Sequence, residues 1–279
     1  LESAGIPRIL FLNKTDKATA GVRDTLKLLQ PASATPLLLR QIPLRKDGVV
    51  VGTIDLALER AHVWREHAES EIVPIPDDDR AREVEARFSM LERLADHDDV
   101  LMEQLLEEIE PPKDEIFDDL AADLRQGAVT PVLIGTAEKG NGVLRLLKTI
   151  RHDAPDIEVT RERLGAPAGG NLAQVVKTVH TPHGGKLSIA RVLSGRIADA
   201  AEITTSAGAT GKVSGIYRML GSHQAKLPAA TAGETVALGK LDDVLTGDTI
   251  TADRATPPRL VELEKAEPVF SVALKPRER

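Results

Sequence analysis

Cysteine is absent from the 279-residue sequence, and aromatic residues make up only 2% of it. The first absence excludes a disulfide framework and a cysteine-ligated metal site, and it fits a reducing compartment, so we expect a cytoplasmic protein. The scarcity of aromatic residues means that any core must be aliphatic. No apolar run approaches the ~18 residues of a membrane-spanning helix, so no membrane association is expected. The length predicts about two domains.

Acidic residues are concentrated in one part of the chain. Residues 66–125 contain 21 acids and 6 bases, a net charge of −15; the whole chain carries −7, so the remainder carries +8. Such a run is often only the solvated face of helices. The alternative interpretation is an acidic docking surface for a protein partner.

Two apolar segments that lead into polar loops predict a buried parallel sheet. Residues 6–12 and 131–134 have the continuous apolar character of strands covered on both faces. The first leads into Asn13-Lys14-Thr15-Asp16 and the second into Gly135-Thr136-Ala137. Helical spacing follows each loop, over residues 22–29 and 143–150.

The region between these segments predicts further strands and helices. Residues 35–57 are interpreted as two strands joined by a turn at Lys46-Asp47-Gly48. Asp77-Asp78-Asp79 is expected to cap a long helix whose buried stripe contains Val84, Phe88, Leu91 and Leu94. A second helix is expected to end at Pro111-Pro112, and a third covers residues 116–124.

The second half of the chain has a different sequence pattern. Residues 165–171 contain one proline and three glycines and are predicted to be a linker. Residues 172–251 alternate between apolar and polar, with regularly spaced glycine turns, which indicates an antiparallel sandwich or barrel. A further strand is expected to begin near Val269, just before the end of the chain.

The two polar loops suit recognition of guanine. Loops at the carboxyl ends of neighbouring parallel strands face one ligand. Guanine presents two adjacent donors, N1–H and the 2-amino group, and an ionised Asp16 accepts both. Asn13 is expected to reach N7, the stem of Lys14 to cover the ring, and the Ala137 N–H to donate to O6. Alone, an Asn-Lys-x-Asp tetrapeptide is also consistent with an ordinary turn in which Asp16 caps the next helix.

Long collinear segments resemble the translational GTPases, most closely bacterial elongation factor G. "RILFLNKTDKA" and "PVLIGTAEKGNGVLRLL" resemble the guanine-recognition motifs, and "VPIPDDDRAREVEARFSMLERLADHDDVLMEQLLEEIEPPKDEI" resembles the subdomain inserted between them. "GGKLSIARVLSGRIADAAEI" and "EPVFSVALKPRER" resemble the second-domain barrel and the start of the third domain. The resemblance covers nearly the whole chain.

The resemblance implies a fold of mixed class, α/β plus all-β. Residues 1–164 would be the C-terminal part of a P-loop GTPase domain, a partial parallel sheet with an α+β insertion at about 36–128. Residues 165–256 would form the antiparallel β-barrel of domain II, and residues 257–279 a linker and the start of domain III. Both ends of the sequence fall against structured segments, so we expect a piece of a longer protein. The incomplete sheet is expected to expose apolar faces, which self-association would cover.

The implied function is that of a ribosome-binding translation GTPase that drives translocation. The resemblance assigns guanine binding to Asn13, Lys14, Asp16, Thr136 and Ala137, with GTP or GDP as ligand and Mg²⁺ in the parent protein. The phosphate loop GxxxxGK[ST] does not occur in the 279 residues, and no catalytic or magnesium-binding residue is assigned, so this chain alone is not expected to hydrolyse GTP. The implied partners are small-subunit ribosomal RNA, at the barrel, and the ribosomal stalk protein, at the acidic insertion.

Several positions depart from the family pattern. Thr15 stands where methionine is usual, Thr136 where serine is usual, and Glu138 where an apolar or basic residue covers the base. An acid at that position would be a poor lid. The departures favour an elongation-factor-G-like paralogue over the main translocase. The alternative is a ribosome-binding factor of the same superfamily with weak GTP turnover, either tetracycline-protection-like, release-factor-like or a non-translocating paralogue.

Other clusters carry less information. His180 and His183 lie three residues apart and His223 follows 40 residues later, but no further ligand is evident and we predict no metal site. His97-Asp98-Asp99 is interpreted as a helix junction. Scattered bases on the predicted barrel are candidates for contacts with ribosomal RNA phosphates, or are ordinary surface residues: Lys186, Arg191, Arg196 and Arg218.

Overall fold

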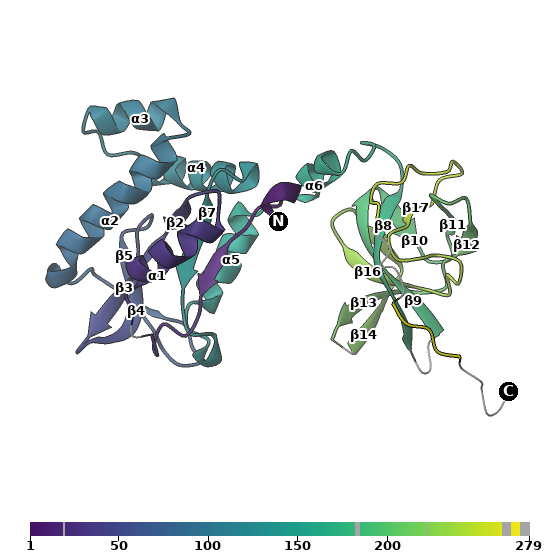
Figure 1. Ribbon diagram of the computed structural model, residues 1–279, viewed down its shortest axis with the longest axis horizontal. Coiled ribbons are helices and arrows are strands. Elements are labelled where there is room, and N and C mark those ends of the chain that lie inside the picture. The colour runs from purple at the N-terminus through teal and green to yellow at the C-terminus, as the bar shows by residue number, and fades with distance from the viewer. Residues whose placement is uncertain (19, 182–184, 222, 264–268, 274–279) are drawn as a thin grey trace. The chain divides into compact units, whose positions relative to one another are not determined.

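The computed structural model describes residues 1–279 except 19, 182–184, 222, 264–268 and 274–279 (Figure 1). The chain forms two compact units, Leu1–Pro155 and Asp156–Arg279. The division falls before helix α6 (Ile157–Arg163), whereas the expected boundary followed residue 164. No helix in the described ranges is long and apolar enough to cross a membrane.

A three-stranded parallel sheet lies at the centre of the first unit, as predicted. Its order is β1 (Leu10–Leu12), β7 (Thr130–Ile134) and β2 (Leu37–Leu39), with β7 parallel to both neighbours. Every residue of β7 is buried. Strand β1 is shorter than the predicted 6–12 and only half-buried, because β7 is its one partner among the described strands.

Helices and 3₁₀ turns flank this sheet. Helix α1 spans Val22–Leu29, as predicted, and α5 (Val143–Asp153) extends beyond the predicted residue 150. Short 3₁₀ turns cover Glu2–Ala4, Gln30–Ala32 and Ala137–Lys139. Helix α5 buries the polar residues Thr149 and Asp153, whereas the apolar Leu144, Leu147 and Ile150 remain exposed.

The insertion between β2 and β7 is an α+β subdomain. Its antiparallel sheet has the order β3 (Gln41–Lys46), β4 (Val49–Asp55), β5 (Arg60–Val63) and β6 (Glu71–Val73). Asp47 and Gly48 both have positive φ in the β3–β4 turn, which confirms the predicted hairpin and matches the twist of its strands. Residues 35–57 therefore contain three strands rather than two, because β2 joins the parallel sheet.

Three helices complete the insertion. They are α2 (Asp77–Ala95), α3 (Asp99–Leu106) and α4 (Lys113–Gln126). Helix α2 begins at Asp77 as expected, but Pro76 is its N-cap and no side chain caps it. Helix α3 ends at Leu106, before the prolines that were expected to stop it, and the left-handed Gly127 ends α4.

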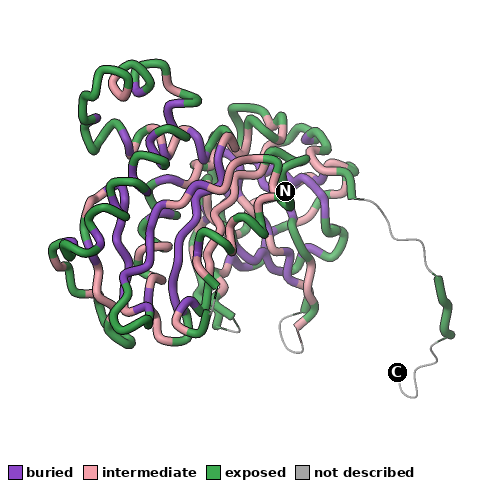
Figure 2. The backbone as a smooth tube through the Cα atoms, turned by 60° about the vertical axis from the view of Figure 1, so that its left-hand side comes forward, coloured by how far each residue is buried: buried purple, intermediate pink, exposed green. Residues whose placement is uncertain are grey.

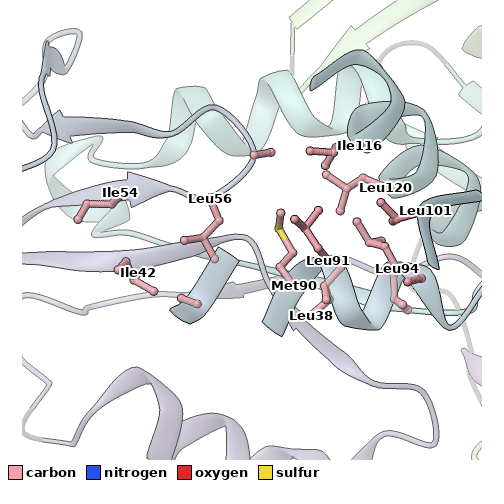
Figure 3. Close-up of a cluster of buried hydrophobic side chains, with 14 of the residues drawn as sticks. Leu38, Ile42, Ile54, Leu56, Met90, Leu91, Leu94, Leu101, Ile116 and Leu120 are labelled. Carbon is pink, nitrogen blue, oxygen red and sulfur yellow. The ribbon is translucent and has the colours of Figure 1, made fainter. Parts of the chain in front are cut away.

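The aliphatic core of the insertion contains a different face of α2 from the predicted one. Leu91 and Leu94 are buried and pack with Met90, Ile54 and Ile116 (Figure 3), but Val84 and Phe88 are 57% and 51% exposed. The reason is that α2 buries Arg87 next to this core. The Arg87 guanidinium donates to the Leu56 carbonyl oxygen at 2.6 Å and lies 3.5 Å from the Glu59 carboxylate.

A buried ion pair joins the strand that enters the insertion to the end of α5. Arg40 is 1% exposed, and its Nη1 donates to the Asp153 carboxylate. The guanidinium also lies 5.7 Å from the centre of the Phe117 ring on α4. Arg145 of α5 pairs at 2.7 Å with Asp55, the last residue of β4. Charged groups thus hold α5 where an apolar stripe would have been expected.

The second unit contains the predicted antiparallel barrel. Eight of its strands form one sheet in the order β12-β11-β17-β8-β9-β16-β13-β14, and β10 pairs with β15. Their bounds are Leu172–Thr181 (β8), Gly185–Ser194 (β9), Arg196–Ala198 (β10), Glu202–Thr205 (β11), Thr210–Lys212 (β12), Ile216–Leu220 (β13), His223–Leu227 (β14), Ala229–Thr231 (β15), Thr235–Gly239 (β16) and Thr249–Thr251 (β17).

Small aliphatic residues fill the barrel, including Ala173, Ala190, Val192, Ile203 and Val236. Burial follows the strands in both units, and the loops are exposed (Figure 2). The strand expected near Val269 is not present over residues 269–273, and the rest of that prediction lies outside the described residues.

Candidate functional site

The two polar loops leave the parallel sheet side by side, as predicted. In the register of β1 and β7, Leu12 lies opposite Ile134, so the loops that follow begin at the same edge. The Gly135 N–H donates to the Leu12 carbonyl oxygen at 3.0 Å. The Thr15 N–H and hydroxyl both donate to the Gly135 carbonyl oxygen, at 3.2 and 3.1 Å. The buried Thr15 therefore ties the loops together.

Asp16 lies against the second loop. The Thr136 hydroxyl donates to Asp16 Oδ1 at 3.0 Å, and Lys139 Nζ lies 3.6 Å from Oδ2. Desolvation raises the pKa of Asp16, but the Thr136 hydrogen bond, the charge of Lys139, a backbone hydrogen bond and Lys17 outweigh it and lower the pKa below its usual value. Asp16 is therefore an ionised acceptor with one oxygen held in place.

Asn13 braces both loops through its side-chain oxygen. Its Oδ1 accepts the Ala137 N–H at 2.9 Å and the Lys14 N–H at 2.8 Å. Lys14 has φ 59°, a left-handed conformation stabilised by this local bond. The Ala137 N–H, which we expected to be available for a ligand, is thus engaged by Asn13. A ligand oxygen at this position has to share or replace that hydrogen bond.

Close backbone packing shapes the second loop. Thr136 and Asn141 exchange backbone hydrogen bonds of 2.9 and 3.1 Å, which turns the chain back over the end of β7. A Cβ atom on Gly135 would lie 2.4 Å from the Asn141 carbonyl oxygen and 2.6 Å from the Phe11 ring. Gly142, with φ 78°, would place a Cβ 2.5 Å from the Ile134 carbonyl oxygen. Only glycine fits at these two positions.

Two cations at the rim, Lys17 and Lys139, were not predicted. Lys17 Nζ pairs with Glu138 Oε2 at 3.2 Å, and Lys139 faces Asp16. Glu138, which we expected to be a poor lid, is therefore partly neutralised by a cation from the opposite loop. These contacts depend on the 3₁₀ turn Ala137–Lys139, which no pattern in the sequence indicated.

The assembled site can bind a neutral, planar group with adjacent N–H donors. Asp16 supplies two acceptor oxygens, one of them fixed by Thr136. The side chain of Lys139, whose Nζ lies 3.6 Å from Asp16 Oδ2, supplies an aliphatic stem beside them. No group of three or more His, Asp or Glu side chains within the described residues is placed to hold a metal ion, and His183 lies outside those residues.

The four candidate bases of the barrel lie on three strands. Lys186 and Arg191 are five residues apart on β9, so their side chains point to opposite faces. Lys186 Nζ donates to the Asp242 carbonyl oxygen at 2.5 Å and Arg191 to the Thr235 hydroxyl at 3.2 Å. Arg218 pairs with Glu234 at 2.9 Å, and Arg196 on β10 is exposed. Their contact with RNA stays a prediction.

A parallel sheet with an α+β insertion, followed in the chain by an antiparallel barrel, is the fold of a translational GTPase segment. Residues 172–253 match the family model described as elongation factor G domain 2. An elongation factor G-like protein of Synechocystis sp. (strain ATCC 27184 / PCC 6803 / Kazusa) is 36% identical over 282 residues, covering all of this chain and 41% of its own length.

A solved structure agrees with this assignment. A crystal structure of a Thermus thermophilus protein matches with a TM-score of 0.77 and 26% sequence identity, over 95% of this chain and 37% of that one. These matches support a segment of a translational GTPase that is similar to elongation factor G. The chain spans about two fifths of the length of these relatives.

Proposed function

We propose that this chain carries the guanine-recognition site and second domain of a cytoplasmic, ribosome-binding GTPase that acts in translocation. The observation that carries the proposal is the pairing of Asp16 with Thr136 across two loops 120 residues apart in sequence. This pairing fixes an ionised carboxylate at the edge of the sheet where ligands of such folds bind. The guanine N1–H and 2-amino group then replace Lys139 as the partner of that carboxylate.

The residues present fit the purine end of GTP or GDP. Asp16 accepts the two guanine donors, the Asn13 amide reaches N7, and the stem of Lys14 covers the ring. The Ala137 N–H serves O6 once it is shared with Asn13. Adenine would direct an amine at that N–H and leave Asp16 facing an acceptor, an arrangement with unpaired polar groups. Phosphate binding, Mg²⁺ and hydrolysis belong to parts of the parent protein outside these 279 residues.

Nucleoside titrations of the chain test this assignment. We expect guanosine to perturb the amide resonances of Thr136 and Ala137 saturably, with at least about tenfold higher affinity than adenosine. Asp16→Asn replaces one acceptor by a donor, so it should weaken guanosine and favour xanthosine, whose 2-oxo group accepts. Asp24→Asn, an exposed acid on α1, is the matched control. Equal binding of guanosine and adenosine, or no response in these loops, would refute the site.

We further propose that the acidic insertion binds the ribosomal stalk. Helix α2 begins with the exposed acids Asp77 and Asp78, followed by Asp79, which is buried and paired with Arg82, and the same helix carries the exposed Val84 and Phe88. A surface of this charge accelerates encounter with a basic partner, and salt screens the effect. Doubling the ionic strength should therefore slow association with stalk protein in stopped-flow measurements. An unchanged rate contradicts this assignment.

A ribosome-binding paralogue with weak GTP turnover is the second candidate. The exposed Glu138 supports it, because an acidic side chain is a poor cover for a base and its ion pair with Lys17 neutralises it only in part. GTP turnover by the parent protein on ribosomes distinguishes the two. Stimulated turnover coupled to movement of the messenger RNA supports a translocase, and binding without turnover supports the paralogue.

A further inference from the structure

A second cavity lies in the first unit, outside the candidate guanine site. It measures about 230 Å³ and lies between the β4–β5 sheet, the loop at residues 64–70 and helix α5. Residues that line it include Arg60, His62, Trp64, Ser70, Arg145 and Lys148. The volume is below the 300–1,000 Å³ typical of pockets for drug-sized ligands, so the cavity suits a small molecule or ion.

The lining is positively charged and rich in unused donors. The lining contains three cations, Arg60, Arg145 and Lys148, and only one carboxylate, that of Glu69. Arg145 is paired with Asp55 at 2.7 Å. Arg60 and Lys148 form no ion pair or side-chain hydrogen bond with any described residue, nor do the Trp64 indole N–H and the Ser70 hydroxyl. Two cations and two neutral donors are therefore available to a ligand.

The protonation of His62 depends on the charge of this cavity. Its Nε2 is buried and has no hydrogen-bond partner among the described residues. Burial lowers the pKa of His62; the charge of Asp55 opposes that shift, and those of Arg145, Arg60 and Lys148 add to it. The imidazole thus lies beside three cations, of which Arg145 is paired with Asp55, while Arg60 and Lys148 form no ion pair with a described residue.

We propose that this cavity binds a small oxyanion of the phosphate class, held by Arg60 and Lys148. Trp64 and Ser70 donate to the remaining oxygens. Charge-assisted hydrogen bonds to Arg and Lys are the strong interactions of phosphate sites. The cavity holds inorganic phosphate or pyrophosphate, and its size does not extend to a nucleotide. This site does not depend on guanine recognition, because none of the five proposed guanine-binding residues lines it.

Binding should be linked to the protonation of His62. The charged groups around the imidazole are Asp55 on β4, Arg60 on β5, Glu69 in the loop, and Arg145 and Lys148 on α5. An anion offsets the three cations, so it favours the imidazolium form and raises the pKa of His62. By reciprocity, phosphate affinity increases as the pH falls through that pKa.

The only tryptophan of the chain, Trp64, provides a selective measurement. We expect inorganic phosphate and pyrophosphate to change its fluorescence saturably at constant ionic strength, and NMR titration to show an upward shift of the His62 pKa. Lys148→Gln and Arg60→Gln should each weaken binding about tenfold. Arg151→Gln removes an exposed cation from the same helix without touching the cavity, and it should bind like the unaltered chain.

Three outcomes would overturn the proposal. One is a response to chloride equal to that to phosphate, since this would show general screening. Another is equal binding by the Lys148→Gln and Arg151→Gln variants. The third is binding of a short RNA phosphodiester with no binding of inorganic phosphate, which would assign the surface to nucleic acid instead. Loss of guanosine binding alone would leave the phosphate result standing, so the two sites fail independently.

Discussion

Removing one partner of the buried Arg40–Asp153 pair should strongly destabilise the first unit. Asp153→Ala leaves the Arg40 guanidinium 1% exposed and without its carboxylate. The nearby charges do not replace it, because Asp55 is itself paired with Arg145. An uncompensated buried charge of this kind costs about 3–5 kcal/mol. The cation–π contact of Arg40 with the Phe117 ring, 5.7 Å away, offsets only about 1 kcal/mol of this loss.

Urea unfolding followed by the fluorescence of Trp64 measures this loss, because Trp64 belongs to the first unit. The double variant Arg40→Met with Asp153→Leu removes both charges and should be more stable than Asp153→Ala alone. Asp24→Ala, which removes an exposed pair with Lys27 at 4.0 Å, should cost less than about 1 kcal/mol. If Asp153→Ala lies within about 1 kcal/mol of the unaltered chain, the role given to this pair is wrong.

Two further substitutions test the loop and the insertion. Gly142→Ala should lower the free energy of unfolding in urea by more than about 2 kcal/mol, since it adds a clash with Ile134 to a left-handed φ. Gly127→Ala also has a left-handed φ but meets no neighbour, so it should cost about 1–2 kcal/mol. Equal costs would contradict the clash. Burial and then Asp98 raise the pKa of Asp119 from 3.8 to about 6, so ionisation destabilises the fold as the pH rises through this window. Asp119→Asn should therefore add about 1–2 kcal/mol at pH 7 and almost nothing near pH 4, and a gain at both pH values would refute this linkage.

Elements with strong local signals were predicted closely. The helix at residues 22–29 has the expected bounds, the strand expected at 131–134 begins one residue earlier at Thr130, and the Asp47-Gly48 turn followed from its composition. The buried faces of helices were less predictable. On α2 two neighbouring stripes are similarly apolar, and Arg87 decides between them by reaching the Leu56 carbonyl oxygen and Glu59. That contact joins residues far apart in sequence, so no local pattern reveals it.

The candidate site could likewise be predicted only in part from the sequence. The convergence of Asp16 with Thr136 and Ala137 follows from parallel strands that end at one edge; strand type indicated it, and the resemblance to translational GTPases selected it over an ordinary turn. The bond from the Ala137 N–H to Asn13 and the position of Lys139 depend on the conformation of two irregular loops. Helix α5 likewise buries Thr149 and Asp153, since Asp153 pairs with Arg40 on another element. Periodicity alone would instead predict that the apolar face of this helix is buried.

The place where the insertion joins the parallel sheet makes it a replaceable module. The chain leaves at β2 and returns at β7, which are hydrogen-bonded neighbours: Leu37 lies opposite Thr130, whose N–H donates to the Pro36 carbonyl oxygen at 2.9 Å. The chain leaves after Leu39, opposite Val132, and returns at Thr130, two residues back along the neighbouring strand, so a grafted domain has to hold its two ends about 8 Å apart. Doubling the length of a flexible graft would add only about 0.6 kcal/mol of closure entropy. This junction is therefore a suitable point for exchanging the acidic subdomain for another, provided that a new partner for Arg145 is supplied in place of Asp55.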